Sequence, residues 1–253
     1  MKVSYLQYFF TYETEIPDGI GFALFGFWHL LWLAAIALIS ILFLYAYAKG
    51  TGKKRRIFEY LISFSMIGWI VVRAIYIALI GEDFLYELPL HLCSMAGILC
   101  AIHCVTGWKW LGQVLYAICL PGTTLALLFP NWNFYPVVHF ITIEGFLFHV
   151  GIVMYVIALL YAHKIIPAMR KLWQVILFLV VVVTPVYFFD RHFGVNYMFV
   201  NQPSAGSPLE WLESFMGNPG YLAGYALLIL LCIFLMDLGY VLVVKRRNRN
   251  SIS

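Results

Sequence analysis

Charged side chains are scarce in this chain. Only 11% of its 253 residues are charged, whereas 63% are hydrophobic and the mean hydropathy is +0.88. A soluble domain carries roughly 25% charged residues, so these charges are too few to cover a water-facing surface of this size. Lipid is expected to cover most of the surface, and basic residues at span ends explain the net charge of +4. We expect a membrane lipid as substrate or ligand and no nucleic-acid partner.

Extracellular disulfides and a metal-binding motif are also missing. The five cysteines all fall inside apolar segments, at positions 93, 100, 104, 119 and 232, which argues against a disulfide framework. Cys100, His103 and Cys104 lie on adjacent helical faces, but zinc would need further ligands from elsewhere. We therefore expect no metal and no cofactor. A cleavable signal peptide is not expected either, because acids and aromatics interrupt any apolar core in residues 1–21.

Long apolar runs predict an all-α, polytopic membrane protein. A span needs about 20 apolar residues. Seven such runs are present, at residues 22–48, 57–80, 88–106, 110–129, 140–162, 172–189 and 221–244. They form a transmembrane domain (22–244) between an interfacial N-terminal segment (1–21) and a basic tail (245–253). Pro121-Gly122 inside the fourth run predicts a kink or a break.

Basic residues cluster in alternate links between these runs. Links 49–56, 164–171 and 245–249 are basic, and Lys109 lies in a fourth link on the same side. The opposite side carries only Lys2 and Arg191, apart from the arginine inside the second span. By the positive-inside rule, seven spans place the N-terminus outside and the C-terminus in the cytoplasm. Six or eight spans would put two basic clusters on opposite sides.

Several ionisable side chains lie inside the predicted spans, where polar groups are costly and commonly mark a site. At about 1.5 Å per residue, Arg73 falls roughly 7 Å outward of the midplane and His149 roughly 3 Å outward. Glu144, His29 and His91 fall roughly 10 Å outward. The five residues come from four spans but share the outer half of the bilayer, which predicts a polar pocket there.

Arg73 keeps its proton and therefore needs an acid or water as a partner. Glu144 matches its depth best, and Glu87 is the second candidate. Asp237 lies on the inner side, roughly 14 Å away in depth, and is a poor partner. The pair is either structural, fixing the bundle, or functional, with Glu144 holding Arg73 toward a lipid phosphate or carboxylate.

The third predicted span, within ELPLHLCSMAGILCAIHC (87–104), carries histidines and cysteines where a passive span would carry leucine. His91 and Cys93 are two residues apart and therefore point to nearly opposite helical faces. Cys93 belongs to a small-residue stripe that is typical of close helix packing. His149 is either satisfied by a carbonyl or hydroxyl, or acts as a general base toward Cys93 or Ser94 at similar depth.

The motifs ELPLHLCS, EGFLFHV and GVNYMFVNQP together resemble the YwaF-type family of bacterial integral membrane proteins over nearly the whole chain. That family is similar to a eukaryotic multispan acyltransferase that acts on ether phospholipids. More distantly, it is similar to intramembrane threonine hydrolases that cleave fatty-acid esters of hydroxy fatty acids. The resemblance implies a bacterial plasma-membrane protein.

Carried over by this resemblance, the acyl-accepting cysteine falls on Cys93 and the histidine on His149. Asn196 and Tyr197 would cap the outer mouth of the pocket. The eukaryotic motif has its cysteine and a histidine adjacent, whereas Leu92 separates the corresponding residues here.

The first functional hypothesis is an intramembrane enzyme, an acyltransferase or a hydrolase of lipid esters. Cys93 would be the nucleophile and His149 the base, with the sulfur and the imidazole ring within a few ångströms. Arg73 and Glu144 would position a lipid carbonyl or phosphate.

The alternative hypothesis is a non-enzymatic protein that binds or transports a lipid or a small anion through Arg73, His29 and His91. The break at Pro121-Gly122 would permit movement, although the sequence shows no inverted repeat of the kind common in transporters. A third hypothesis is a scaffold in which the polar residues only lock the helices together.

Overall fold

The computed structural model describes residues 5–204 and 207–250 of the chain, and all regular structure in these ranges is helical. This confirms the predicted all-α class. The α-helices are α1 (Phe27–Lys49), α2 (Gly52–Ile80), α3 (Leu92–Thr106), α4 (Lys109–Val114), α5 (Leu120–Leu128), α6 (Phe140–Tyr161), α7 (Leu172–Phe193), α8 (Pro208–Met216) and α9 (Tyr221–Asn250). Short 3-10 turns lie at Tyr5–Tyr8, Glu13–Glu15, Phe84–Tyr86, Met169–Lys171 and Tyr197–Phe199, and a π-helical turn at Leu115–Cys119 joins α4 to α5.

Six helical segments in the described residues are long and apolar enough to cross a membrane. They are α1, α2, the continuous segment Lys109–Leu128, α6, Met169–Phe193 and Tyr221–Leu242. The third predicted span is shorter than expected, because α3 has only 15 residues and begins at Leu92. Pro89 disfavours helical geometry at the residue before it, and His91 is the extended N-cap of α3.

The fourth predicted span does not break at Pro121-Gly122. The chain remains helical from Lys109 to Leu128, and Pro121 lies in the first turn of α5, directly after the π-helical turn. A π turn changes which backbone carbonyl groups are paired with which N–H donors. Proline has no backbone N–H to donate, and it is tolerated in the first turn of a helix. The irregularity that proline signals in the sequence is therefore a local change of helix type.

The predicted ends of two other segments also shift. The first span was expected from Phe22, but α1 begins at Phe27 after an extended N-cap at Gly26. The predicted basic tail begins inside α9, which continues to Asn250, and residues 251–253 of that tail lie outside the described residues.

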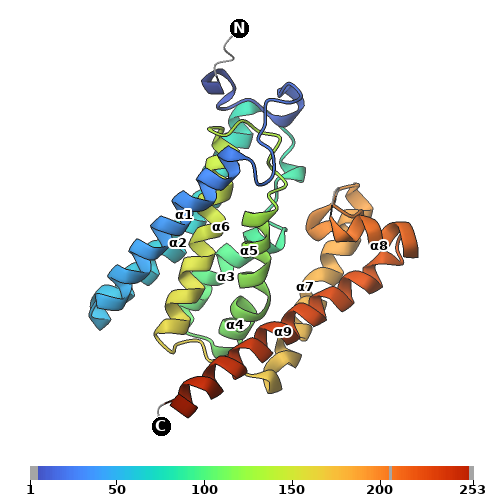
Figure 1. The fold of residues 1–253 in the computed structure, drawn as a ribbon. Coiled ribbons are helices and arrows are strands. Elements are labelled where there is room, and N and C mark those ends of the chain that lie inside the picture. Colours follow the sequence, from blue (N-terminus) through green and yellow to red (C-terminus); the bar gives the residue numbers. More distant parts are fainter. Residues whose placement is uncertain (1–4, 205–206, 251–253) are drawn as a thin grey trace.

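α6 is the central helix of a bundle that α1, α2, α3 and α5 surround (Figure 1). In the most apolar window of α6, 67% of the residues are buried, against 11% in α1, α7 and α9. α7 and α9 lie to one side of this bundle and meet it through α4 and the π-helical turn. The exposed apolar faces of α1, α7 and α9 are therefore available to lipid.

Small residues allow α2, α3 and α6 to approach closely. A Cβ at Gly97 would lie 2.7 Å from the Phe148 ring and 3.1 Å from Cβ of Met66, and one at Gly151 would lie 2.3 Å from Cε of Met66. In a bilayer, packing of this kind provides much of the attraction between helices. It fixes the position of α3, and therefore of Cys93, relative to α6.

Candidate functional site

Arg73 of α2 joins two carboxylates in one ion cluster. Its Nε and Nη2 each lie 2.8 Å from Oε2 of Glu87, and its Nη1 lies 3.1 Å from Oε2 of Glu144. Glu87 follows the 3-10 turn after α2, whereas Glu144 comes from the second turn of α6. The structure thus contains both of the partners that helix depth suggested. Asp237 instead accepts a hydrogen bond from Gln113 at 3.2 Å.

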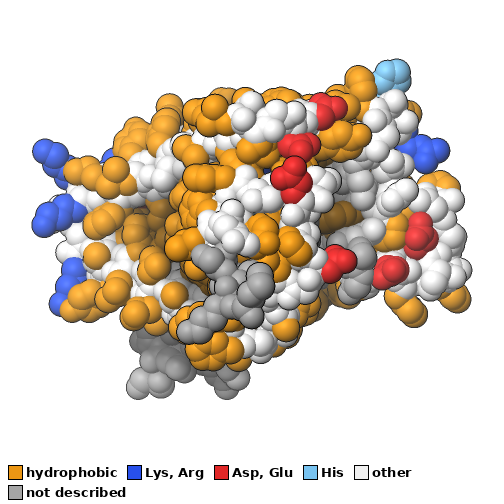
Figure 2. Space-filling model, turned by 90° about the horizontal axis from the view of Figure 1, so that it is seen from above, with side chains coloured by type: hydrophobic (Ala, Val, Ile, Leu, Met, Phe, Trp, Pro, Cys, Tyr) orange, Lys and Arg blue, Asp and Glu red, His pale blue; other side chains and the backbone are white. Residues whose placement is uncertain are grey.

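The cluster contains more acid than base. Glu13, in the N-terminal segment, is close enough to Glu87 and Arg73 to interact with both. Partial loss of water and the charge of Glu87 raise the pKa of Glu13. Figure 2 shows acidic side chains on this end of the molecule, among hydrophobic ones. The Arg73 side chain is 33% exposed and that of Glu144 only 7%, so the cluster reaches from the interior to an open surface.

The N-terminal segment packs over the C-terminal end of α2 and the N-terminal end of α6. His139 donates from Nε2 to the carbonyl of Thr11 at 2.8 Å and accepts at Nδ1 from the Ile141 amide at 3.0 Å. The hydroxyl of Tyr76 donates to the carbonyl of Phe10 at 3.3 Å. Burial lowers the pKa of His139 to about 4. This neutral histidine caps α6 and ties the segment to it.

His149 is held in one tautomer by its own helix. Nδ1 lies 2.6 Å from the Gly145 carbonyl, which can only accept, so Nδ1 carries the proton. Nε2 is then an acceptor, and none of the described residues donates a hydrogen bond to it. The Trp132 ring stacks on the imidazole at 4.9 Å between centroids and an angle of 26°. Neutral His149 with a free Nε2 has the geometry of a general base.

Gly145 makes room for this stack. A Cβ at Gly145 would lie 2.7 Å from Cε2 of Trp132 and 3.0 Å from its Nε1. Trp132 is buried, and its Nε1 has no hydrogen-bond acceptor in the described part of the chain. One turn of α6 therefore supplies both the carbonyl and the space that orient His149.

Cys93 lies in the first turn of α3, half-buried. Glu144 is close enough to interact with it electrostatically, as are Cys119 and Tyr225. Within the described residues no hydrogen bond joins Cys93 to His149. Cys93 interacts with Glu144 and His149 with Arg73, and these two partners form an ion pair, but the structure does not show the close Cys93–His149 pair that the sequence hypothesis expected.

His91 and Tyr197 meet at the N-terminal end of α3. The two rings lie 5.0 Å apart, and Nδ1 of His91 accepts from the Met198 amide at 3.3 Å. The Tyr197 hydroxyl donates to the Leu85 carbonyl at 2.6 Å and accepts from the Leu88 amide at 2.8 Å. His91 interacts electrostatically with Arg73 and His149, so it borders the cluster.

Two predicted site residues make contacts away from this cluster. His29 is fully buried among aromatic rings, and both of its ring nitrogens are used, one by the Phe25 amide at 2.9 Å and one by the Leu127 carbonyl at 3.0 Å. Asn196 accepts from the amides of Asn201 and Gln202 and so shapes its own loop. His29 has no nitrogen left for a ligand.

A second ionic cluster, which the sequence did not lead us to expect, lies beside the link between α1 and α2. Glu59 of α2 is 1% exposed and accepts from the Tyr47 hydroxyl at 2.6 Å and from Lys164 Nζ at 2.6 Å. Arg56 lies 3.5 Å from it. The sequence feature that could have indicated this cluster is Glu59, an acidic residue near the start of the apolar run 57–80 and close to the basic link 49–56. This cluster ties the α1–α2 link to the segment after α6.

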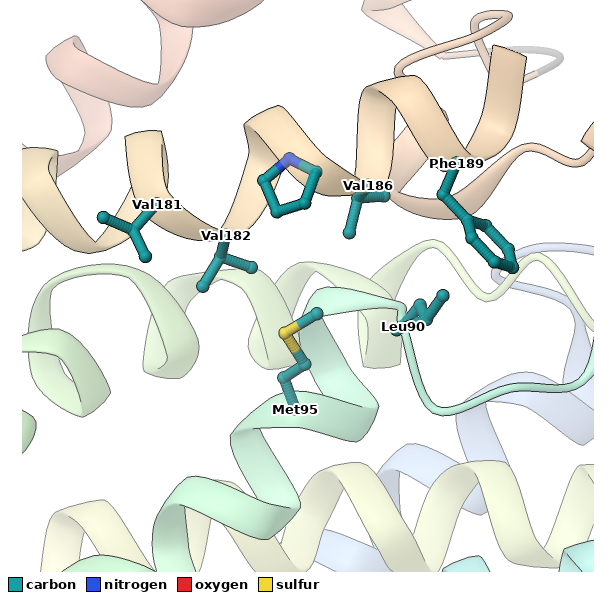
Figure 3. A pocket seen from close by; sticks show the side chains of 7 residues that line it. Leu90, Met95, Val181, Val182, Val186 and Phe189 are labelled. Atoms are coloured by element: carbon teal, nitrogen blue, oxygen red, sulfur yellow. The ribbon is translucent and has the colours of Figure 1, made fainter. Parts of the chain in front are cut away.

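An apolar groove of about 300 Å³ lies between α3 and α7 (Figure 3). It is lined by Leu90, Met95, Val181, Val182, Pro185, Val186 and Phe189. Leu90 precedes His91, so one end of the groove reaches the N-terminal end of α3. Among the described residues, no group of three or more His, Cys, Asp and Glu side chains is placed to hold a metal ion.

Six helical segments of the described residues are long and apolar enough to cross a membrane, which defines a multi-pass membrane protein. A family model, that of the TMEM164 family, matches residues 24–237, and the chain belongs to this family. Comparisons with curated proteins and with solved structures each found no match.

Proposed function

We propose that the protein is an intramembrane enzyme that transfers or hydrolyses the acyl group of a lipid ester, with Cys93 as nucleophile and His149 as base. The observation that carries this proposal is the state of His149. Its Nδ1 proton is held by the Gly145 carbonyl, which leaves Nε2 free within a neighbourhood that also contains Cys93, Arg73 and Glu144. The resemblance of the motifs around Cys93 and His149 to acyl-transferring membrane proteins supports the same assignment.

The proposal includes seven crossings, with the N-terminus outside, the C-terminus in the cytoplasm and α3 as a short crossing. In Figure 1 the segment before α1 and the C-terminal end of α9 lie at opposite ends of the molecule, as an odd number of crossings requires. Six long apolar helices plus α3 satisfy that requirement. The basic links then lie on the cytoplasmic side. In this topology the Arg73 cluster faces the outer leaflet of a bacterial plasma membrane.

In the proposed reaction, Cys93 gives its thiol proton to Nε2 of His149 while the sulfur bonds to the acyl carbon of a lipid ester. The ester C–O bond breaks, and His149 passes the proton to the departing oxygen. Water or a lipid hydroxyl then gives a proton to His149 and bonds to the acyl carbon. The C–S bond breaks and the proton returns to the sulfur, which completes hydrolysis or transfer.

Arg73 is proposed to bind the lipid headgroup or its carbonyl. A guanidinium has five N–H donors, and the two glutamates engage three of them. The two that remain suit a phosphate or carbonyl oxygen, and a lipid can approach because the side chain is partly exposed. The apolar groove between α3 and α7 supports a lipid substrate, since its lining suits an acyl chain.

Acyl loading of the protein tests this proposal. Protein in nanodiscs would be incubated with phosphatidylcholine that carries alkyne-tagged fatty acids, and bound acyl groups would be detected before and after hydroxylamine, which cleaves thioesters. We expect hydroxylamine-sensitive label that Cys93→Ser abolishes and that His149→Ala reduces about 10²- to 10⁴-fold in rate. Cys232→Ser, a matched change of another half-buried cysteine, should keep the label. Label that survives in both Cys93→Ser and His149→Ala would refute the proposal.

A non-enzymatic lipid- or anion-binding protein is the second candidate, and the missing Cys93–His149 hydrogen bond favours it. Arg73 and His91 would then hold the ligand, without His29. Binding of the same phosphatidylcholine, measured by native mass spectrometry, separates the two functions. Unchanged binding in Cys93→Ser, its loss in Arg73→Ala and no acyl label on the parent protein would select the binding function.

A further inference from the structure

We propose that α8 is an interfacial helix that docks on the bilayer surface through Trp211 and Phe215. These two side chains are four residues apart, and 68% and 81% of their surfaces are exposed. Their rings lie nearly parallel, at 8°, with 6.4 Å between centroids. Together they form an exposed aromatic ridge on a nine-residue helix outside the spanning segments. Exposing two adjacent aromatic side chains to water costs hydrophobic free energy. At the membrane–water interface, in contrast, aromatic rings such as that of tryptophan lie favourably at the level of the lipid headgroups.

The orientation of this ridge is fixed by contacts on other sides of α8. Leu212 fits against Gly224 of α9, where a Cβ would lie 2.9 Å from Cδ2 of the leucine. Leu209 is buried. Asn218 donates to Oε1 of Glu213 at 3.2 Å, which holds the turn between α8 and α9. These contacts direct the aromatic ridge away from the protein.

The polar side of α8 faces a different environment. Glu210 and Glu213 border a polar hollow of about 320 Å³, whose other lining residues are Gln202, Pro203 and Asn218. An aromatic ridge on one side and carboxylates on another match the pattern of helices that lie in the interface plane. The polar hollow would remain in water while the ridge enters the headgroup layer.

Lipid is the occupant that the surroundings of α8 favour. α8 lies beside the end of α9 that is remote from Asn250, and residues 217–220 join it to α9 (Figure 1). α8 packs against α9 through Leu212 and Gly224, and the apolar surface of α9 is also exposed, at Leu227 and Leu231 for example, so the ridge belongs to a helix that is packed on a lipid-facing one. In the proposed topology the ridge lies at the outer leaflet.

Spin labels on two sides of α8 test this inference. Phe215→Cys places the label on the ridge, and Ser214→Cys places a matched label at an exposed position about 100° away around the helix. The five native cysteines are buried or half-buried. Spin labelling of the parent protein would measure the background signal that they contribute. Collision rates with oxygen, which concentrates in lipid, and with a water-soluble nickel chelate would be measured in phosphatidylcholine vesicles.

At position 215 we expect an oxygen-to-nickel collision ratio at least about tenfold that at position 214. Equal ratios at both positions would show that α8 stands in water and would overturn the inference. So would a label at 215 whose signal is broadened in undiluted samples and sharpens on dilution with unlabelled protein, since a second copy would then cover the ridge. These outcomes do not depend on acyl transfer.

Discussion

Arg73 forms ion pairs with both Glu87 and Glu144, so a single cation compensates part of the charge of two carboxylates. Because the Glu144 side chain is 7% exposed, removing the cation leaves a carboxylate without compensation. A buried pair costs roughly 3–5 kcal/mol when one partner is removed. The partial exposure of Arg73 reduces this figure.

Arg73→Met is therefore expected to destabilise the protein by about 2 kcal/mol. Arg73→Met combined with Glu144→Gln should recover part of that loss, because the buried charge is gone. Thermal unfolding of both single variants and the double variant would measure the coupling, expected at about 0.5–3 kcal/mol. Strictly additive losses would show that the two side chains do not interact.

A second prediction at this scale concerns Gly145, whose missing side chain admits Trp132. Gly145→Ala should displace the indole, disturb its stack on His149 and cost about 1–3 kcal/mol. Gly68→Ala on α2 is the matched control, because no atom lies within 4 Å of its added Cβ. Thermal unfolding and intrinsic tryptophan fluorescence would report both effects. Equal behaviour of the two variants would contradict the packing argument.

At the scale of elements, His139 joins the N-terminal segment to the start of α6. Its Nδ1 accepts a hydrogen bond as the N-cap, which requires the neutral ring. Burial lowers the pKa of His139 from 6.5 to about 4. Between these values the unfolded chain binds a proton that the folded chain excludes. The contribution of His139 is thus complete above pH 6.5 and decreases as the pH falls toward 4.

We expect the wild-type protein to lose about 1–3 kcal/mol of stability between pH 7 and pH 4 through this residue. His139→Asn keeps a cap that does not titrate and should remove that part of the pH dependence. Glu13 has a raised pKa and opposes the trend, so the difference between variant and wild type is the quantity to measure. Parallel stability curves for the two proteins would contradict this role.

The sequence predicted that these segments are helices and roughly where each one lies, whereas it did not predict how each helix is rotated about its own axis. The expected fifth span, 140–162, nearly coincides with α6, and depth along the helices paired Arg73 with Glu144 before any contact was known. Depth also placed His29 near the cluster, but its ring points into an aromatic core instead. Hydrophobic periodicity is weak in helices that lipid surrounds, so the sequence does not show which face meets which neighbour.

At the scale of the whole molecule, the proposed topology puts the N-terminal segment outside the cell and the α1–α2 link in the cytoplasm. A membrane-impermeant maleimide should label Asp18→Cys on intact cells, because residue 18 is exposed in the N-terminal segment. Thr51→Cys, exposed between α1 and α2, should react only after the membrane is opened. Labelling of both positions on intact cells would contradict the topology.

The proposed reaction requires a lipid to reach Cys93, His149 and Arg73 together. A density map of the protein in nanodiscs, enlarged by a bound antibody fragment, tests this most directly. We predict a lipid with its ester carbonyl carbon about 3–3.5 Å from Sγ of Cys93 and with Nε2 of His149 turned toward that sulfur. Lipids confined to the outer faces of α1, α7 and α9, with Cys93 and His149 enclosed in separate packing contacts, would contradict it.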